Sequence, residues 1–241
     1  MATNRSVMKP TPRASRSIRQ PVGFTPAISL DQATQRIGAD TFQKKLESFF
    51  DSKRFSDLTI RTADKEHKVH KMVICGQSEV FSLMFDHDWK KSLENVIELK
   101  ADHPRAIEAM ISFMYKFCYD DTSDGLSPML LHAKVYGAAH KYNVTPLQTY
   151  AGKRFENAVR SGWNTGDLPD AVTEVYTELP STGCGLRKVL AECSRFHIQA
   201  LLLKDDFKRL LENTAGFAAD IIPLLVHRPA IPPTRCTTVQ R

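Results

Sequence analysis

The side chains that could do chemistry in this chain are histidines and cysteines, and their spacing does not assemble a reactive site. His67 and His70 form an H-x-x-H pattern in or beside a predicted strand, where the two-residue period points them to opposite faces. His132 and His140 lie on a predicted helix without a carboxylate at ligand spacing. Cys184, between two glycines, is the one candidate reactive thiol, but no base is paired with it in the neighbouring sequence.

The remaining motifs and the cysteine count also argue against catalysis. The sequence lacks the patterns of a P-loop, a dinucleotide fold, a serine nucleophile elbow and a zinc protease. Its five cysteines are an odd number, are widely spaced and include no C-x-x-C pair. That usage is typical of buried reduced thiols in a reducing compartment. We therefore expect no catalytic site, no cofactor and no metal, with an enzyme kept as a minor alternative.

The positive charge is concentrated near the N-terminus. The chain has 33 Lys and Arg against 27 Asp and Glu, a net charge of +6. Five of these cations and no acid fall within residues 1–22, and the rest of the chain is close to neutral. This distribution argues against a specific nucleic-acid partner for the folded part. Weak, salt-sensitive attraction of the tail to nucleic acid stays an alternative. A mitochondrial transit peptide is another, although three prolines interrupt the helix it needs.

Composition and hydrophobic pattern divide the chain into four segments. We expect a disordered basic tail over residues 1–40, a folded domain over 41–160, a helical extension over 164–227 and a frayed end over 228–241. The sequence has no apolar run of about 18 residues and no hydrophobic segment of signal-peptide type at its start. We expect no membrane partner and an intracellular location, in the cytoplasm, the nucleus or both.

The folded domain is predicted to begin with a helix over residues 41–54 and a hairpin. The hairpin has a first strand around Leu58 and Ile60 and a second strand-like run over 69–74. A small-residue break at 75–77 precedes a helix that Ser78 caps.

The pattern continues with a short strand over 95–100 and a helix that Asp102 caps. Ser127-Pro128 and Thr145-Pro146 each place a hydroxyl cap before a proline, so each predicts another helix start. Short helices follow beyond residue 168, the last of which Pro223 should bend. These helices are too few for a stable domain of their own, so we expect them to pack on the domain before them.

In order and in wording, residues 41–160 resemble the BTB/POZ domain. The matching positions are Ser56-Asp57-Leu58, His70-Lys71, Ser78-x-x-Phe81, and Phe113-Met114-Tyr115 with Tyr119. The stretch HKMVICGQSEVF and the helical C-terminus are similar to short stand-alone BTB proteins common in fungi. The resemblance implies an α+β fold, in which a cluster of short helices flanks a small mixed sheet, with an all-α C-terminal extension. It also implies a non-catalytic adaptor that commonly homodimerises and recruits a protein partner.

Two sets of site residues follow from the resemblance. The family's dimer interface is built largely from the helix before the Ser-Asp-Leu strand, which here carries Phe42, Leu46, Phe49 and Phe50; the alternative is that the phenylalanines cover the protein's own core. A partner groove would use Asp57, His70 and Lys71. Asp57 and Lys71 could form an ion pair there, or each could be a solvated charge at a strand end.

A third set concerns cullin binding. Family members that recruit a cullin carry an apolar-x-Glu motif after the helix that contains Phe81. In this chain the corresponding residues are Phe85, Trp89 and Lys91. Trp89 keeps the apolar anchor, whereas Lys91 stands where the acid is expected and reverses its charge. A substrate adaptor of a cullin-type ubiquitin ligase is therefore an alternative function that Lys91 weakens.

Overall fold

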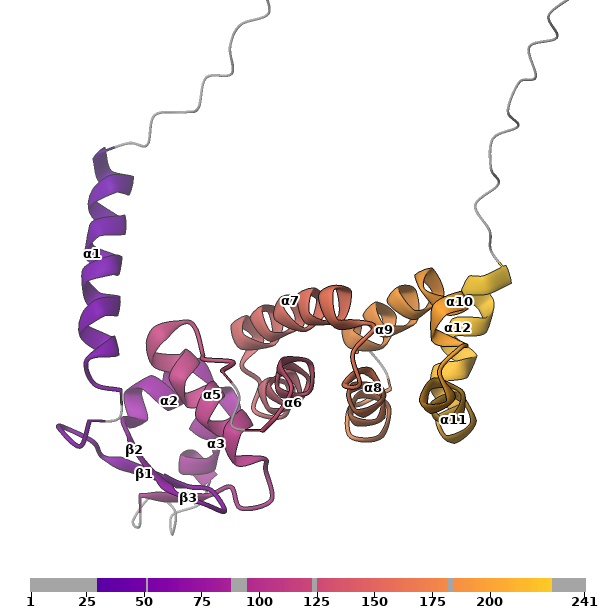
Figure 1. Cartoon of the computed structure of the whole chain (residues 1–241). Helices are drawn as coiled ribbons and strands as arrows, with labels where there is room; N and C mark the ends of the chain where they lie inside the picture. Colours follow the sequence, from indigo (N-terminus) through magenta and orange to yellow (C-terminus); the bar gives the residue numbers. More distant parts are fainter. Residues whose placement is uncertain (1–29, 51, 88–94, 123–124, 182–183, 227–241) are drawn as a thin grey trace, which may run out of the picture. The chain divides into compact units, whose positions relative to one another are not determined.

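A computed structural model describes residues 30–50, 52–87, 95–122, 125–181 and 184–226 (Figure 1). The chain divides into two units, Met1–Asp40 and Thr41–Arg241. Helix α1, Leu30–Glu47, begins in the first unit and ends in the second. The elements that follow it are β1 Leu58–Arg61, β2 Glu66–Val69, α2 Lys71–Gln77, α3 Glu79–His87, β3 Val96–Glu98 and α5 Pro104–Lys116. The helices that follow are α6 Pro128–Lys141, α7 Thr145–Gly162, α8 Leu168–Thr177, α9 Gly185–Phe196, α10 Ile198–Leu201, α11 Asp205–Asn213 and α12 Ala215–Val226. None of the described helices is long and apolar enough to cross a membrane.

The sheet is small and mixed, as the family resemblance implies. Its order is β2-β1-β3, with β1 antiparallel to β2 and parallel to β3. Leu58 and Ile60 of the central strand are buried. Arg61 follows them and faces its cross-strand neighbours: its guanidinium lies 2.7 Å from the carboxylate of Glu66 and 3.1 Å from that of Glu98. Such pairs stabilise strand register modestly.

Two hydrophobic clusters share two helices. The first joins the sheet to α2, α3 and α5, and it includes Leu147 and Ala151 from the first half of α7. The second joins α8, α9, α11 and α12, and it includes Phe155 and Val159 from the second half of α7. Helix α6 also contributes to both clusters. The C-terminal extension is all-α, and it packs against α6 and α7.

The predicted second strand was placed too late. β2 ends at Val69, and residues 71–77 form α2, so the predicted break at 75–77 lies inside a helix. The amides of Val73 and Ile74 donate to the carbonyl of His70, closing the first turn. Packing of Val73 and Ile74 into the core favours this helix over the strand that β-branched residues suggest.

Other boundaries also differ. Helix α1 begins at Leu30 and ends at Glu47, whereas residues 30–40 were expected to be tail and the helix was expected to reach 54. Asp102 does not cap α5, because its carboxylate accepts hydrogen bonds from Lys141 and Tyr142 instead. Thr145 lies inside α7, and Val144 precedes it as the cap residue.

The two serine caps are as predicted. Ser127 Oγ accepts from the Leu130 amide at 3.2 Å, and Ser78 Oγ accepts from the Phe81 amide at 3.2 Å. The Ser78 hydroxyl also donates to the Tyr142 carbonyl at 2.6 Å, which connects α3 to the end of α6.

Candidate protein-interaction surface

Residues 52–56, in the loop that precedes β1, are held by hydrogen bonds to one another. The Arg54 amide donates to Ser52 Oγ at 3.2 Å. The Ser56 amide and hydroxyl both donate to the Lys53 carbonyl, at 3.3 and 2.9 Å. Between them, Phe55 has a φ of 61°, in the left-handed region that a bulky side chain rarely adopts. Residues 52–56 are therefore held by local hydrogen bonds, with a strained residue among them.

His70 ties this loop to the core. Its Nε2 lies 2.9 Å from the Arg54 carbonyl, and its Nδ1 lies 2.7 Å from the Tyr115 hydroxyl. Because a carbonyl can only accept, Nε2 carries the proton, and in the neutral ring Nδ1 accepts from Tyr115. The His70 amide donates to the same hydroxyl oxygen at 2.9 Å. Burial raises the pKa of Tyr115 to about 12, so it remains a protonated donor.

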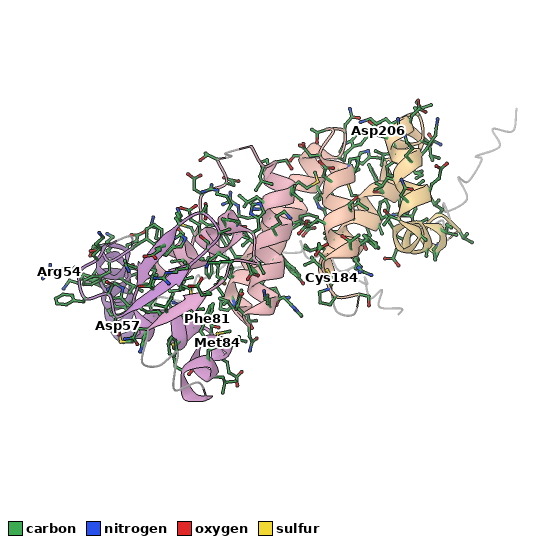
Figure 2. The ribbon with its side chains drawn as sticks, turned by 90° about the horizontal axis from the view of Figure 1, so that it is seen from below. Arg54, Asp57, Phe81, Met84, Cys184 and Asp206 are labelled. Atoms are coloured by element: carbon green, nitrogen blue, oxygen red, sulfur yellow. The ribbon has the colours of Figure 1, made fainter. Side chains whose placement is uncertain are left out.

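The structure brings Asp57 and Lys71 together, but through the backbone of Lys71. Asp57 Oδ1 accepts a hydrogen bond of 2.7 Å from the Lys71 amide, at the first residue of α2. The Lys71 ammonium lies 4.8 Å from the ring centroid of Phe85. Asp57 thus satisfies an otherwise unpaired amide at a helix N-terminus, where negative charge is favourable. Figure 2 shows Asp57 and Arg54 at the same end of the sheet.

The predicted dimer residues divide into two groups. Leu46, Phe49 and Phe50 are partly buried against the first hydrophobic cluster. The Phe49 ring lies 5.6 Å from that of His70, and the Phe50 ring lies 5.9 Å from that of Tyr115. Phe42, one turn earlier on α1, is 62% exposed. Of the four, only Phe42 presents most of its surface to solvent.

Two exposed apolar residues, one in this loop and one on the adjoining helix α2, were not singled out from the sequence. Phe55 is 71% exposed and Met72, the second residue of α2, is 77% exposed. No hydrophobic period in the sequence marks either residue as exposed. Phe55 lies in a loop, and Met72 directly precedes two buried residues of α2. Only the positive φ of Phe55 and the tertiary position of α2 identify them.

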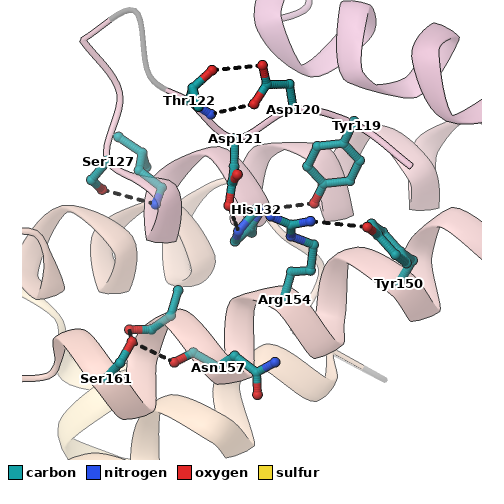
Figure 3. A network of polar contacts seen from close by, with 12 residues as sticks. Tyr119, Asp120, Asp121, Thr122, Ser127, His132, Tyr150, Arg154, Asn157 and Ser161 are labelled. Atoms are coloured by element: carbon teal, nitrogen blue, oxygen red, sulfur yellow. Dashed lines mark hydrogen bonds and ion pairs between the residues drawn. The ribbon is translucent and has the colours of Figure 1, made fainter. Parts of the chain in front are cut away.

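A polar network joins the loop before α6 to α6 and α7 (Figure 3). The buried His132 lies with Nδ1 2.9 Å from the Tyr119 hydroxyl and Nε2 3.6 Å from Asp121. Arg154 pairs with Asp121 and donates to the Tyr150 hydroxyl at 3.1 Å. Burial lowers the pKa of His132 to about 4, so the ring is neutral at physiological pH.

This network borders a cavity of about 550 Å³. The two charged side chains of this network, Asp121 and Arg154, form an ion pair with each other. The arrangement fits the prediction that His132 is an ordinary helix histidine, since its partners belong to the fold.

The other sequence candidates stay apart. His67 is buried on β2, whereas His70 faces Tyr115. Cys184 is a partly buried free thiol at the start of α9, and burial raises the pKa of Cys193. Over the described ranges, no three His, Cys, Asp or Glu side chains are grouped to hold a metal ion.

The predicted cullin contacts are only partly visible. Phe85 is partly buried, with the Lys71 ammonium over its ring. Trp89 and Lys91 lie outside the described residues.

Comparison with curated proteins gives partial relatives. Two mouse proteins, TD and POZ domain-containing protein 1-like and TD and POZ domain-containing protein 1, are each 28% identical to this chain, over 114 and 107 residues. These segments cover 46% and 43% of this chain. They span only 29% and 27% of the relatives' own lengths.

The chain was also compared with solved structures and with a family model. The BTB domain of zebrafish PATZ1 matches with 16% identity and a TM-score of 0.41, over 51% of this chain and 94% of that one. The BTB domain of human Gigaxonin matches with 19% identity and a TM-score of 0.38, over 54% of this chain and 97% of that one.

The BTB/POZ family model matches residues 46–153. Members of this family generally mediate protein–protein interaction, generally homodimerise and are generally not enzymes. Residues 46–153 of this chain are therefore a BTB/POZ domain.

Proposed function

We propose that this chain is a non-catalytic adaptor that pairs with a second copy through its BTB/POZ domain and recruits a protein partner. The surface for pairing is the outer face of α1 around Phe42. Recruitment uses the neighbouring surface around Asp57, His70 and Lys71. The chain acts inside the cell, in the cytoplasm or the nucleus.

The exposure of Phe42 is the observation that carries the pairing. Leu46, Phe49 and Phe50 attach the end of α1 to the domain, and the Gln43 side chain donates to the Lys116 carbonyl at 3.5 Å. The helix end is therefore anchored while Phe42 stays 62% exposed. Fully burying a phenylalanine side chain stabilises by about 1.5–3 kcal/mol, and a two-fold interface gains this twice.

Two contacts support the recruiting surface. His70 fixes the loop at Arg54, and Asp57 fixes the start of α2. The side chains around them are thus held on a rigid base, which limits the entropy lost when a partner binds.

Light scattering coupled to size exclusion tests the pairing on the full-length chain. At micromolar concentration we expect twice the monomer mass of 27.2 kDa. Phe42→Asp should give a monomer, because a carboxylate in an apolar interface lacks a partner. Phe196→Asp is the matched control: Phe196 is 78% exposed at the end of α9, far along the chain, and its replacement should leave the dimer intact. A monomeric wild type would remove the dimer from the proposal.

A further inference from the structure

Phe55 occupies a position for which the fold gives little reason to select phenylalanine. Its φ of 61° strains a bulky residue, and such strain persists where the surroundings impose it. Its ring is 71% exposed and, among the residues that the structure describes, has two close aromatic or cationic neighbours. These are Phe49, with ring centroids 6.1 Å apart, and the Arg54 guanidinium, 4.9 Å from the ring centroid. Asparagine or glycine would adopt this backbone with less strain and lose little packing.

The neighbouring α2 offers a second apolar side chain. Met72 is 77% exposed and directly follows Lys71, whose amide is bound by Asp57. The loop and the start of α2 are thus joined at two points, His70 to Arg54 and Asp57 to Lys71. We call Lys53, Arg54, Phe55, Asp57, Lys71 and Met72 the Phe55 patch.

The charge around these two apolar side chains is positive. The Phe55 patch contains three cations and one carboxylate, a net charge of +2. A hollow of about 310 Å³ adjoins it and is lined by Lys53, Asp57 and Lys68, among others. A partner that approaches this surface gains electrostatically if it is acidic.

We propose that Phe55 is an aromatic anchor that inserts into an apolar pocket of a different protein, and that the rim of this pocket is acidic. Binding energy at protein interfaces concentrates in a few aromatic and arginine side chains that enter desolvated pockets, and Phe55 with Arg54 fits this pattern. The inference rests on the proposed adaptor function and specifies the chemistry of its partner.

A second copy of this chain is the less favourable occupant. In a two-fold interface a patch faces itself, so the +2 charge of one patch would lie against that of the other. Like-charge juxtaposition of this kind opposes binding. The self-pairing proposed for Phe42 therefore uses a different part of the surface.

Photo-crosslinking from position 55 tests the anchor. The full-length chain carries p-benzoylphenylalanine in place of Phe55, or in place of Phe196 as the control, in cells that make the protein. We expect position 55, and not 196, to give an adduct with a non-self protein. The crosslinked peptide should come from an apolar pocket flanked by acidic residues. Combining Lys53→Glu with Arg54→Glu should lower the adduct yield by about tenfold.

Competition with unlabelled chain separates anchoring from folding. Wild-type chain should suppress the adduct, whereas Phe55→Asn chain should not, although its melting temperature is equal or higher. Four results would each overturn the proposed anchor. Two concern the adduct itself: an adduct with the mass of two copies, or no adduct at all. The other two are an adduct whose yield the charge reversals do not change, and equal competition by the Phe55→Asn chain. Light scattering keeps the two proposals apart. A chain that dimerises without a position-55 adduct refutes only the anchor, and a monomer that gives the adduct refutes only the pairing.

Discussion

Replacing Leu190 with alanine tests whether the C-terminal helices and the BTB/POZ domain unfold together. Leu190 is fully buried on α9, in the same cluster as Phe155 and Val159 of α7. Truncating a buried leucine costs about 2–5 kcal/mol, from the lost transfer free energy and the cavity left behind. For a domain of this size, a loss of about 3 kcal/mol lowers the melting temperature by about 6–12 °C.

Hydrogen exchange read by mass spectrometry on the full-length chain locates the effect. Because α6 and α7 belong to both clusters, we expect the amides of β1 and of α9 to lose protection by the same free energy. Leu203→Ala removes the same atoms from an exposed side chain and should change stability by less than about 0.5 kcal/mol. If protection falls in α9 while β1 keeps its wild-type value, the extension opens independently and the coupling through α7 is refuted.

Three further predictions concern single groups. Burial holds the pKa of His132 at about 4, below its ordinary 6.5, so the unfolded chain binds the extra proton between these values. The contribution of His132 to the free energy of unfolding should be complete above pH 6.5 and should fall by up to about 3 kcal/mol as the pH drops toward 4. In urea unfolding, His132→Gln should lack this pH dependence, whereas the control His140→Gln should retain it. Asp57→Ala leaves the Lys71 amide without its acceptor and should cost about 1 kcal/mol in urea unfolding, whereas Asp57→Asn, which keeps an oxygen, should cost less. We predict that Lys91, in place of an acid, weakens cullin binding by on the order of 2–5 kcal/mol, so that Lys91→Glu strengthens a cullin pulldown. Tight wild-type binding that the substitution does not change would show that the motif is misaligned.

Local signals in the sequence predicted local features well. Ser78 and Ser127 were identified as caps because a capping side chain bonds an amide within its own first turn. The helices of the C-terminal extension followed from helical spacing, whereas the small mixed sheet was expected from the family resemblance. Residues 71–74 were wrongly assigned to a strand, because a short run that contains valine and isoleucine fits a strand and a buried helix equally.

Features that depend on distant residues could not be predicted. Asp102 was expected to cap α5, but it bonds Lys141 and Tyr142 from α6, and no local pattern shows that competition. The outward position of Phe55 likewise depends on His70, which holds the preceding carbonyl from the other side of the hairpin. The family resemblance placed Asp57 and Lys71 near each other, but it could not show that Asp57 contacts the Lys71 amide and not its ammonium.

Helix α7 explains why the family match and the packing boundary disagree. The match ends at residue 153, in the middle of α7. Leu147 and Ala151 precede this point and face the first cluster, whereas Phe155 and Val159 follow it and face the second. One continuous helix therefore contributes to two cores. A chain cut at 153 would lose two buried apolar side chains that belong to the same cluster as Met129 and Ala133 of α6. The extension is thus required to complete the surface of α6, which is the physical reason to treat residues 41–226 as one folded body that carries the Phe55 patch at its sheet end.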